Sequence, residues 1–330
     1  MVNVSGYMDC PPVRLKYVFV HNLYVYGIGA ICVFGIVGNV LSLFAFGLER
    51  QAVVSIRILK VLACCDMSFL AVCLVYFFVR HVRYRIRFGN LVFRYKDNDI
   101  DAKLAYSTVV LYFITQQIRN WITAYISVNR FLNIRFPLWS RRVLTWKCCK
   151  INVVSTCLIS IVCHVPRYWL SGLEYKSVHR CSFDLVAPYI VKPKPASYAR
   201  FDMIVYFGFL VGFPMVVLYA TNLGLLNSIH IARSRRSVVL AAVSSPKSSR
   251  SDRQADKMVM AILLIFTICE TPACVDRVAS AAGFAFKSDD FKQYARKAGL
   301  FLVVLDSALN FVVYLSINLK FRQNLKRLFR

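Results

Sequence analysis

Acidic residues are scarce in this chain, and the motifs of metal and hydrolytic sites are missing. Only 16 of the 330 residues are Asp or Glu, against 42 Lys or Arg, and only five are His. The His residues show no metal-ligand spacing, and no Ser or Cys stands in a nucleophile motif. We therefore expect neither an enzyme nor a bound metal or cofactor.

Long polar segments are missing as well. Hydrophobic residues make up 58% of the sequence, and aromatic residues 14%, which is more than a soluble protein of this size would carry. They come in runs of about 20 residues or more, which as helices cross roughly 30 Å of hydrocarbon. The runs predict seven membrane-spanning helices, near residues 24–48, 54–79, 104–132, 147–170, 202–229, 258–282 and 298–317.

These spans predict an all-α membrane protein. We expect a tail over 1–23, a seven-transmembrane helix bundle over 24–317, and a short amphipathic C-terminal helix over 318–330. The run from Tyr24 is too long for a signal peptide and lacks its small-residue cleavage site, so it reads as the first span. The Ser-rich stretch 244–251 predicts a flexible basic loop.

Basic residues divide almost evenly between the two membrane faces, so the positive-inside rule does not decide the orientation. A basic segment follows the second span and contains Arg80, Arg83, Arg85, Arg87, Arg94 and Lys96. Contact with lipid headgroups or water explains it, and so does an electrostatic funnel for an acidic ligand. We expect the lipid bilayer as a partner. We expect no nucleic acid, because the basic residues lie on both membrane faces and not on one continuous surface.

Four charged residues lie inside the predicted spans, where charge is expensive. They are Asp66, Arg119, Glu270 and Asp306. A helix rises about 1.5 Å per residue, and counts from the span ends place all four near mid-membrane. Paired ions are retained at such depths, whereas a lone ion is costly, so we expect partners among them.

Short motifs follow one another in order along the spans. They are Gly38-Asn39, Leu62-Ala63-Cys64-Cys65-Asp66, Asn129-Arg130-Phe131, Pro214, Phe266-x-x-Cys269-x-x-Pro272, Asn310-Phe311-Val312-Val313-Tyr314 and the basic amphipathic stretch 320–329. This set resembles the rhodopsin-like (class A) G-protein-coupled receptors over nearly the whole chain. The resemblance implies a plasma-membrane protein with its N-terminus outside, an extracellular ligand and a heterotrimeric G protein as partner.

Three details resemble the invertebrate FMRFamide-type neuropeptide receptors within that family. They are Pro166-Arg167 closing the fourth span, Asn222 eight residues after Pro214, and Asn310-Phe311 followed by Tyr314. The finer resemblance implies a peptide ligand. A chemosensory receptor for small molecules is the alternative within the same fold, and a transporter or proton-conducting protein is the alternative from another class.

The outer cysteines depart from the family pattern. The family's cysteine at the head of the third span falls at Ala105, so its usual bridge to Cys181 cannot form. Cys10 and Cys181 alone lie in segments expected outside, and either they pair with each other or both are free. Asn3 begins a glycosylation sequon that agrees with an outside N-terminus.

Arg119 stands at a position that the family uses for a cation. The family's counterpart of Asp66 binds sodium with help from the third and seventh spans, and the third-span position here is Arg119. We expect its guanidinium to replace the ion and to hold Asp66 and Asp306, with Asn310 beside them. Asp66→Asn would then leave Arg119 under-compensated. The alternative is that Arg119 turns toward a loop or another helix.

Other candidate site residues follow from the resemblance. Glu270 replaces the family's pocket-floor Trp, and it either receives a basic group of the ligand or joins Arg119. The candidate ligand-binding residues are Tyr112, Gln116, Glu270, Asp202, Asp276 and Arg277. The candidate residues for activation and G-protein coupling are Asn129, which replaces an acid, with Arg130, Asn222, Lys257 and Tyr314.

Overall fold

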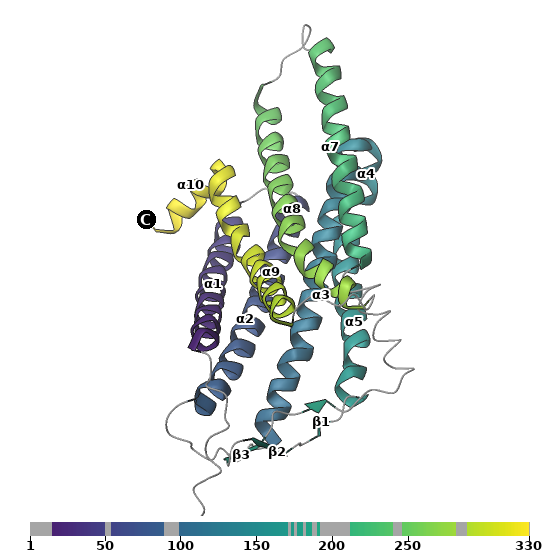
Figure 1. Ribbon diagram of the computed structural model, residues 1–330. Coiled ribbons are helices and arrows are strands. Elements are labelled where there is room, and N and C mark those ends of the chain that lie inside the picture. The colour runs from purple at the N-terminus through teal and green to yellow at the C-terminus, as the bar shows by residue number, and fades with distance from the viewer. Residues whose placement is uncertain are drawn as a thin grey trace, which may run out of the picture.

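In the computed structural model of the protein, the described residues include seven long helices that form an elongated bundle (Figure 1). The structure describes residues 15–49, 54–88, 99–170, 173–174, 177–180, 183–186, 190–191, 212–239, 246–281 and 289–329. The long helices are α1 (Leu15–Gly47), α2 (Val54–Phe88), α3 (Asp99–Arg135), α5 (Trp146–Leu170), α7 (Phe213–Val239), α8 (Pro246–Ala281) and α9 (Asp289–Ile317). The predicted all-α class with seven helices is confirmed.

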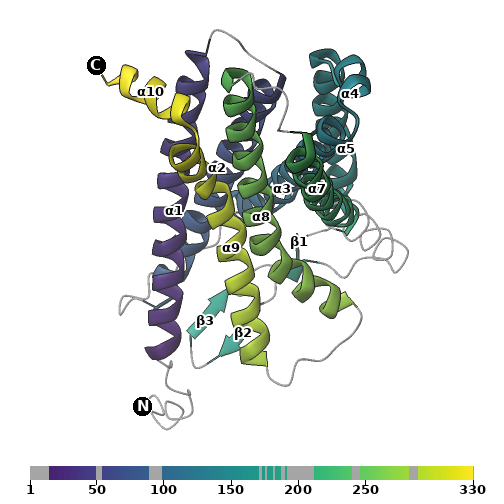
Figure 2. The same cartoon turned by 90° about the horizontal axis from the view of Figure 1, so that it is seen from above.

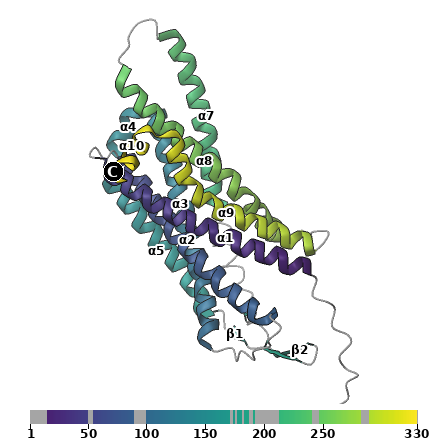
Figure 3. The same ribbon diagram turned by 90° about the vertical axis from the view of Figure 1, so that its left-hand side faces the viewer.

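The bundle has two distinct ends. Two short helices, α4 (Pro137–Val143) and α10 (Leu319–Leu328), lie at one end, and there α7 and α8 project beyond the other helices (Figures 1 and 3). The short strands lie at the opposite end (Figure 1). We call these the α10 end and the strand end.

Helix α3 runs through the middle of the bundle. It packs against α2, α5, α7 and α8, whereas α1, α9 and α8 lie side by side (Figure 2). Five of the described helices are long and apolar enough to cross a membrane, and α7 contributes the shorter apolar stretch Phe213–Leu225. Helix α3 is less apolar because it carries a set of polar residues that are buried among its neighbours, namely Gln116, Gln117, Arg119, Asn120 and Thr123.

Four short strands were not predicted from the sequence. β1 (Leu173–Glu174) pairs antiparallel with β4 (Ile190–Val191), and β2 (Ser177–Arg180) pairs with β3 (Phe183–Val186). Strands of two to four residues are too short for an alternating pattern to reveal them. The four strands follow α5 in the chain and lie at the strand end of the bundle.

Several predicted features lie outside the described residues. Asn3, Cys10, Cys181 and Asp202 are among them, so the sequon and the Cys10–Cys181 pairing stay predictions. The same holds for the side chains of the basic segment after the second span. The ten cysteines that the structure does describe are free thiols.

The prediction of a flexible loop over 244–251 is wrong for most of that stretch. Helix α8 already begins at Pro246, well before the apolar residues of the sixth span. Proline fits the first turn of a helix, because its missing N–H is not needed there. The Lys, Arg, Gln and Ala residues that follow favour helix, so α8 extends beyond the predicted span.

Two apolar clusters fill the bundle. The first lies toward the α10 end and includes Phe46, Phe266 and Tyr314. The second lies toward the strand end and includes Phe69 and Tyr112. Burial of such large side chains among helices supplies the packing that holds a membrane bundle together. Charged side chains between these clusters need partners.

Helix α10 is docked on the bundle by its apolar face. Asn318 caps the helix, since its Oδ1 accepts a hydrogen bond of 3.1 Å from the Phe321 backbone N–H. The Phe321 ring is buried at 5.2 Å from the Phe46 ring and 5.7 Å from the Tyr314 ring, measured between centroids. Basic residues cover the exposed face, as the amphipathic pattern predicts.

A glycine allows the close approach of α1 to α2 and α9. A Cβ atom on Gly35 would lie 2.6 Å from Leu70 Cδ1 and 2.9 Å from Ala308 Cβ. Gly29, six residues earlier on the same helix, has no atom within 4 Å of such a Cβ. Small residues at helix contacts let backbones pack closely in membranes, and Gly35 serves that role here.

We expect Gly35→Ala to destabilise the protein by about 1–3 kcal/mol, because the added methyl group overpacks a three-helix contact. Gly29→Ala is the matched control and should leave stability unchanged or slightly higher. Thermal unfolding of both purified variants in the same detergent checks this. Equal melting temperatures for the two variants would contradict the packing assigned to Gly35.

Candidate functional site

A buried guanidinium joins three helices at the centre of the bundle. Arg119 of α3 is only 1% exposed. Its Nη1 donates hydrogen bonds of 2.7 Å to Asp306 Oδ2 and 2.7 Å to Ser307 Oγ, both on α9. Its Nη2 forms an ion pair with Glu270 Oε1 on α8. Of the two alternatives for Arg119, the structure has the inward one.

Aromatic rings flank this guanidinium. Its central carbon lies 5.0 Å from the centroid of the Phe69 ring and 5.2 Å from that of the Phe266 ring. These distances are within the range of cation–π attraction. Because the two rings belong to the two apolar clusters, Arg119 lies between them and is shielded from water on both sides.

Asp66 lies beside this ion-pair cluster. Asp66 and Arg119 are both described by the structure, and they form no ion pair with each other. It is fully buried on α2, and its Oδ2 accepts a hydrogen bond of 2.7 Å from Asn310 Nδ2 on α9. It remains within electrostatic range of the guanidinium. The sequence-based expectation paired Arg119 with Asp66 and Asp306. In the structure, Glu270 and not Asp66 is the second acid that forms an ion pair with Arg119, because its side chain on α8 faces the guanidinium.

Further hydrogen bonds tie α1 to the same place. Asn39 Nδ2 donates to the Ser307 backbone oxygen at 3.1 Å and to the Gly35 backbone oxygen at 2.9 Å. Ser307 therefore accepts from Arg119 with its side chain and from Asn39 with its backbone. Together these contacts connect α1, α2, α3, α8 and α9 around one layer of polar groups.

The charges in this layer do not balance. Asp66, Glu270 and Asp306 are 0%, 1% and 2% exposed, and Arg119 is the one cation that pairs with any of them among the described residues. Three ionised carboxylates and one guanidinium would carry a net charge of −2. Uncompensated ions are costly in such surroundings.

Most candidate ligand-binding residues are in the interior. Tyr112 and Gln116 are one turn apart on α3, and both are buried. The Tyr112 ring packs at 5.4 Å from the Phe69 ring and 6.3 Å from the Tyr76 ring, between centroids. Glu270, expected either in the pocket or with Arg119, is engaged with Arg119.

The remaining ligand-binding candidates lie toward the strand end. Asp276 of α8 is mostly buried, and its Oδ2 is 3.4 Å from Arg296 Nε of α9. This ion pair links the two helices toward the strand end of the bundle. The side chain of Arg277 and all of Asp202 lie outside the described residues.

A polar network crosses from α3 through α7 to α8 toward the α10 end. Ser127 Oγ lies 2.6 Å from Thr221 Oγ1 and donates a 3.1 Å hydrogen bond to Asn222 Oδ1. Asn222 Nδ2 donates to Thr267 Oγ1 at 3.3 Å. Of these four residues only Asn222 was singled out from the sequence. The hydroxyl partners gave no signal, because Ser and Thr in apolar helices commonly bond their own backbone.

The other activation candidates have different surroundings. Asn129 Oδ1 accepts a 2.7 Å hydrogen bond from Asn133, one turn further along α3, and Arg130 beside it is half-buried. Lys257 is exposed on α8. Tyr314 is fully buried, with its ring centroid 5.1 Å from that of Phe46. Tyr314 therefore belongs to the packed interior and not to a surface.

A buried histidine was missed by the sequence reasoning. His164 of α5 lies with its Nε2 2.7 Å from Gln117 Oε1 of α3, and both side chains are fully buried. The Phe113 ring stacks on the imidazole at 6.1 Å. A polar residue in each of two spans was the only signal, and pairing them requires knowing how the two helices are rotated.

Comparisons with known proteins agree with this architecture. The model of the family described as "7 transmembrane receptor (rhodopsin family)" matches residues 38–314. "Sex peptide receptor-related protein 2" of Caenorhabditis elegans is 24% identical over 240 residues, which cover 66% of this chain and 52% of that protein. A second C. elegans protein, named as a G-protein coupled receptor, is 24% identical over 263 residues, covering 77% and 57%. The chain thus spans about half the length of these relatives.

We expect Arg119→Gln to destabilise the protein by about 3–5 kcal/mol, because it leaves buried carboxylates without their cation. Asp66→Asn should cost much less, since both ion pairs of Arg119 are made with other residues. This reverses the expectation from the sequence, in which Asp66→Asn would leave the guanidinium under-compensated. Thermal unfolding of the purified variants gives the order.

A double variant provides the control for this order. Arg119→Gln combined with Glu270→Gln removes one cation and one acid together, so it should recover part of the stability lost in Arg119→Gln alone. If Asp66→Asn lowers the melting temperature as much as Arg119→Gln, or if the double variant recovers nothing, the pairing assigned to Arg119 is wrong.

Proposed function

Since the chain belongs to the rhodopsin family of seven-transmembrane receptors, we propose that it is a plasma-membrane receptor for an extracellular peptide. In this proposal the N-terminus and the strand end face outward. The α10 end faces the cytoplasm and a heterotrimeric G protein. Ligand binding shifts the population between two arrangements of the bundle.

The contact of Arg119 with Glu270 and Asp306 is the observation that carries this proposal. Ion pairs that join three helices are either made or broken, so they favour discrete arrangements of α3, α8 and α9 over gradual ones. We propose that the guanidinium does permanently what a bound sodium ion does in the family that the motifs resemble. The oxygen-bearing residues of this chain that would surround a sodium ion at this place are Asp66, Asp306, Ser307 and Asn310.

A peptide ligand is supported by two lines. One matched relative carries "sex peptide receptor" in its name, and three details of the sequence resemble the FMRFamide-type neuropeptide receptors. The ion pair of Asp276 with Arg296 lies between α8 and α9 toward the strand end, where a peptide would enter. A charged group of the ligand could replace either partner there, and Tyr112 and Gln116 lie deeper below.

The intracellular side of the proposal rests on residues near the α10 end. Half-buried Arg130 and exposed Lys257 lie on α3 and α8 toward this end. Between these helices, the network of Ser127, Asn222 and Thr267 passes through α7. A change in the tilt of α8 would break the long Asn222–Thr267 hydrogen bond first. This network is therefore the proposed route from the ion-pair cluster to the G-protein face.

A chemosensory receptor for small molecules remains the alternative within this family. The transporter alternative is less well supported by the site, because the central charges bind one another and Arg119 is enclosed by aromatic rings. A translocation path would need these groups to line water.

In cells that express the chain, we expect one peptide of a library that includes RF-amides to raise calcium or to change cAMP. Arg130→Ala should abolish the response while surface staining of the receptor stays at the wild-type level. A response to small odorants and to no peptide would favour the chemosensory alternative. Ion flux through vesicles that contain only the purified chain would instead contradict a receptor.

We expect sodium to have no specific effect on the melting temperature of the wild-type protein and to raise that of Arg119→Ser. Removing the guanidinium leaves an anionic, oxygen-lined space, and an ion that binds only the folded state stabilises it. N-methylglucamine chloride at equal ionic strength is the control salt. An equal sodium response of both proteins would contradict the replacement of the ion by Arg119.

A further inference from the structure

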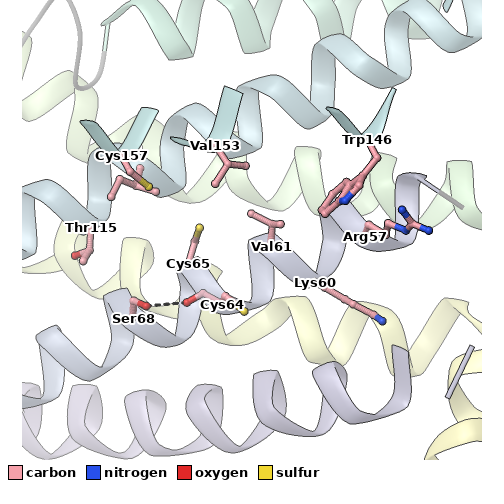
Figure 4. A pocket seen from close by; sticks show the side chains of 11 residues that line it. Arg57, Lys60, Val61, Cys64, Cys65, Ser68, Thr115, Trp146, Val153 and Cys157 are labelled. Atoms are coloured by element: carbon pink, nitrogen blue, oxygen red, sulfur yellow. Dashed lines mark hydrogen bonds between the residues drawn. The ribbon is translucent and has the colours of Figure 1, made fainter. Parts of the chain in front are cut away.

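A groove of about 520 Å³ lies between α2, α3 and α5, away from the ion-pair cluster. Figure 4 shows Arg57 and Trp146 at one end of it, with Lys60 nearby, and Thr115 and Cys157 at the other. The stretch between these ends is lined mainly by apolar groups and thiols. The groove therefore has a cationic end and an apolar length.

This groove opens on the outer surface of the bundle. Cys64 and Ser68 on its α2 wall are exposed, and so are Val154 and Leu158 of α5 beside it. Both helices are long and apolar enough to cross a membrane here, over Ile56–Phe77 and Trp146–Val165. In a membrane, an open apolar groove at this depth is in contact with lipid.

Helix α5 is the least buried of the five apolar spans in the described part of the chain. Only 22% of its span is buried inside the protein, against 39–44% for the other four apolar spans. It packs mainly on α3, and the groove separates it from α2. A molecule in the groove would contact all three helices and fill this space.

Among the residues that the structure describes, no carboxylate pairs with Arg57 or Lys60 at the cationic end. The Arg57 guanidinium lies 5.5 Å from the Trp146 ring centroid, and Lys150 Nζ lies 5.8 Å from the same ring. Neither Arg57 nor Lys60 forms an ion pair with any residue that the structure describes. Both lie near the start of α2, where a Lys or Arg side chain reaches the headgroup layer.

We propose that this groove binds one anionic phospholipid of the leaflet at the α10 end. Its phosphate lies between Arg57 and Lys60, and one acyl chain runs past Val61 and Cys65 toward Cys157. A zwitterionic lipid brings its own ammonium group and would leave the two cations unbalanced. A sterol brings only a hydroxyl group. The positive charge of Arg57 and Lys60 therefore favours an anionic headgroup, and the apolar part of the groove accommodates the acyl chain.

The proposal uses the orientation proposed above, in which the α10 end faces the anionic cytoplasmic leaflet. It needs neither the peptide nor the G protein. A negative result in the peptide screen therefore leaves it standing, and a negative result in the lipid experiment leaves the receptor proposal standing.

Trp146 reports on the groove directly. The purified chain is placed in phosphatidylcholine vesicles with a small fraction of brominated phosphatidylserine or, for comparison, brominated phosphatidylcholine. Bromine quenches nearby tryptophan, and subtracting the signal of Trp146→Phe isolates this residue from the other three of the four Trp residues. We expect phosphatidylserine to be preferred at Trp146 on the order of tenfold, as two adjacent cations near a membrane surface suggest.

Two double variants test where this preference comes from. Arg57→Gln with Lys60→Gln should remove it, whereas Arg322→Gln with Lys326→Gln should keep it. The control pair removes the same charge from exposed positions on α10, at the same end of the bundle. Cys157→Phe keeps all charges but fills the groove, and it should also reduce the preference.

Native mass spectrometry gives a second readout, one phosphatidylserine retained per wild-type chain. If the Arg57→Gln, Lys60→Gln double variant fails to fold, the number of phosphatidylserine molecules retained by Cys157→Phe still tests the proposal, and this number should be lower than for the wild-type chain. Equal quenching by the two lipids would overturn the proposal. So would loss of the preference in the α10 control pair, which would indicate general surface charge instead of a site.

Discussion

The ion pairs of Arg119 with Glu270 and Asp306 constrain the rotation of three helices at once. In hydrocarbon, a guanidinium without carboxylates is far more costly than one that is paired. A helix turns by about 100° per residue, so shifting α3, α8 or α9 by one position would point its charge away from the others. The arrangement in which all three meet is therefore strongly selected over its neighbours.

The rest of the bundle follows from this contact. Ser307 lies next to Asp306 in sequence and joins both Arg119 and Asn39, which brings in α1. One turn along α9, Asn310 binds Asp66 and brings in α2. Phe69 and Phe266 close the two faces of the guanidinium and separate the charged layer from water. A polar centre thus organises an otherwise apolar molecule.

The same centre relates stability to function. The layer contains three carboxylates and one guanidinium, so its electrostatic balance is sensitive to any motion that changes which acid Arg119 contacts. A receptor requires two arrangements of similar free energy, and competing partners for one cation are a way to obtain them. The lipid groove acts elsewhere, on α2 and α5, and would influence the bundle through packing.

Length, hydropathy and the rise of a helix depend only on the chain, so the sequence predicts seven long helices, roughly where they lie, and that four charges share one depth. It also carried the family motifs. The pairing of Arg119 with Glu270 and not with Asp66 is visible only in the folded bundle, as are the contacts of Ser307, His164 and the hydroxyl partners of Asn222. The depth of a side chain follows from counting residues, whereas its direction depends on how each helix rotates against its neighbours.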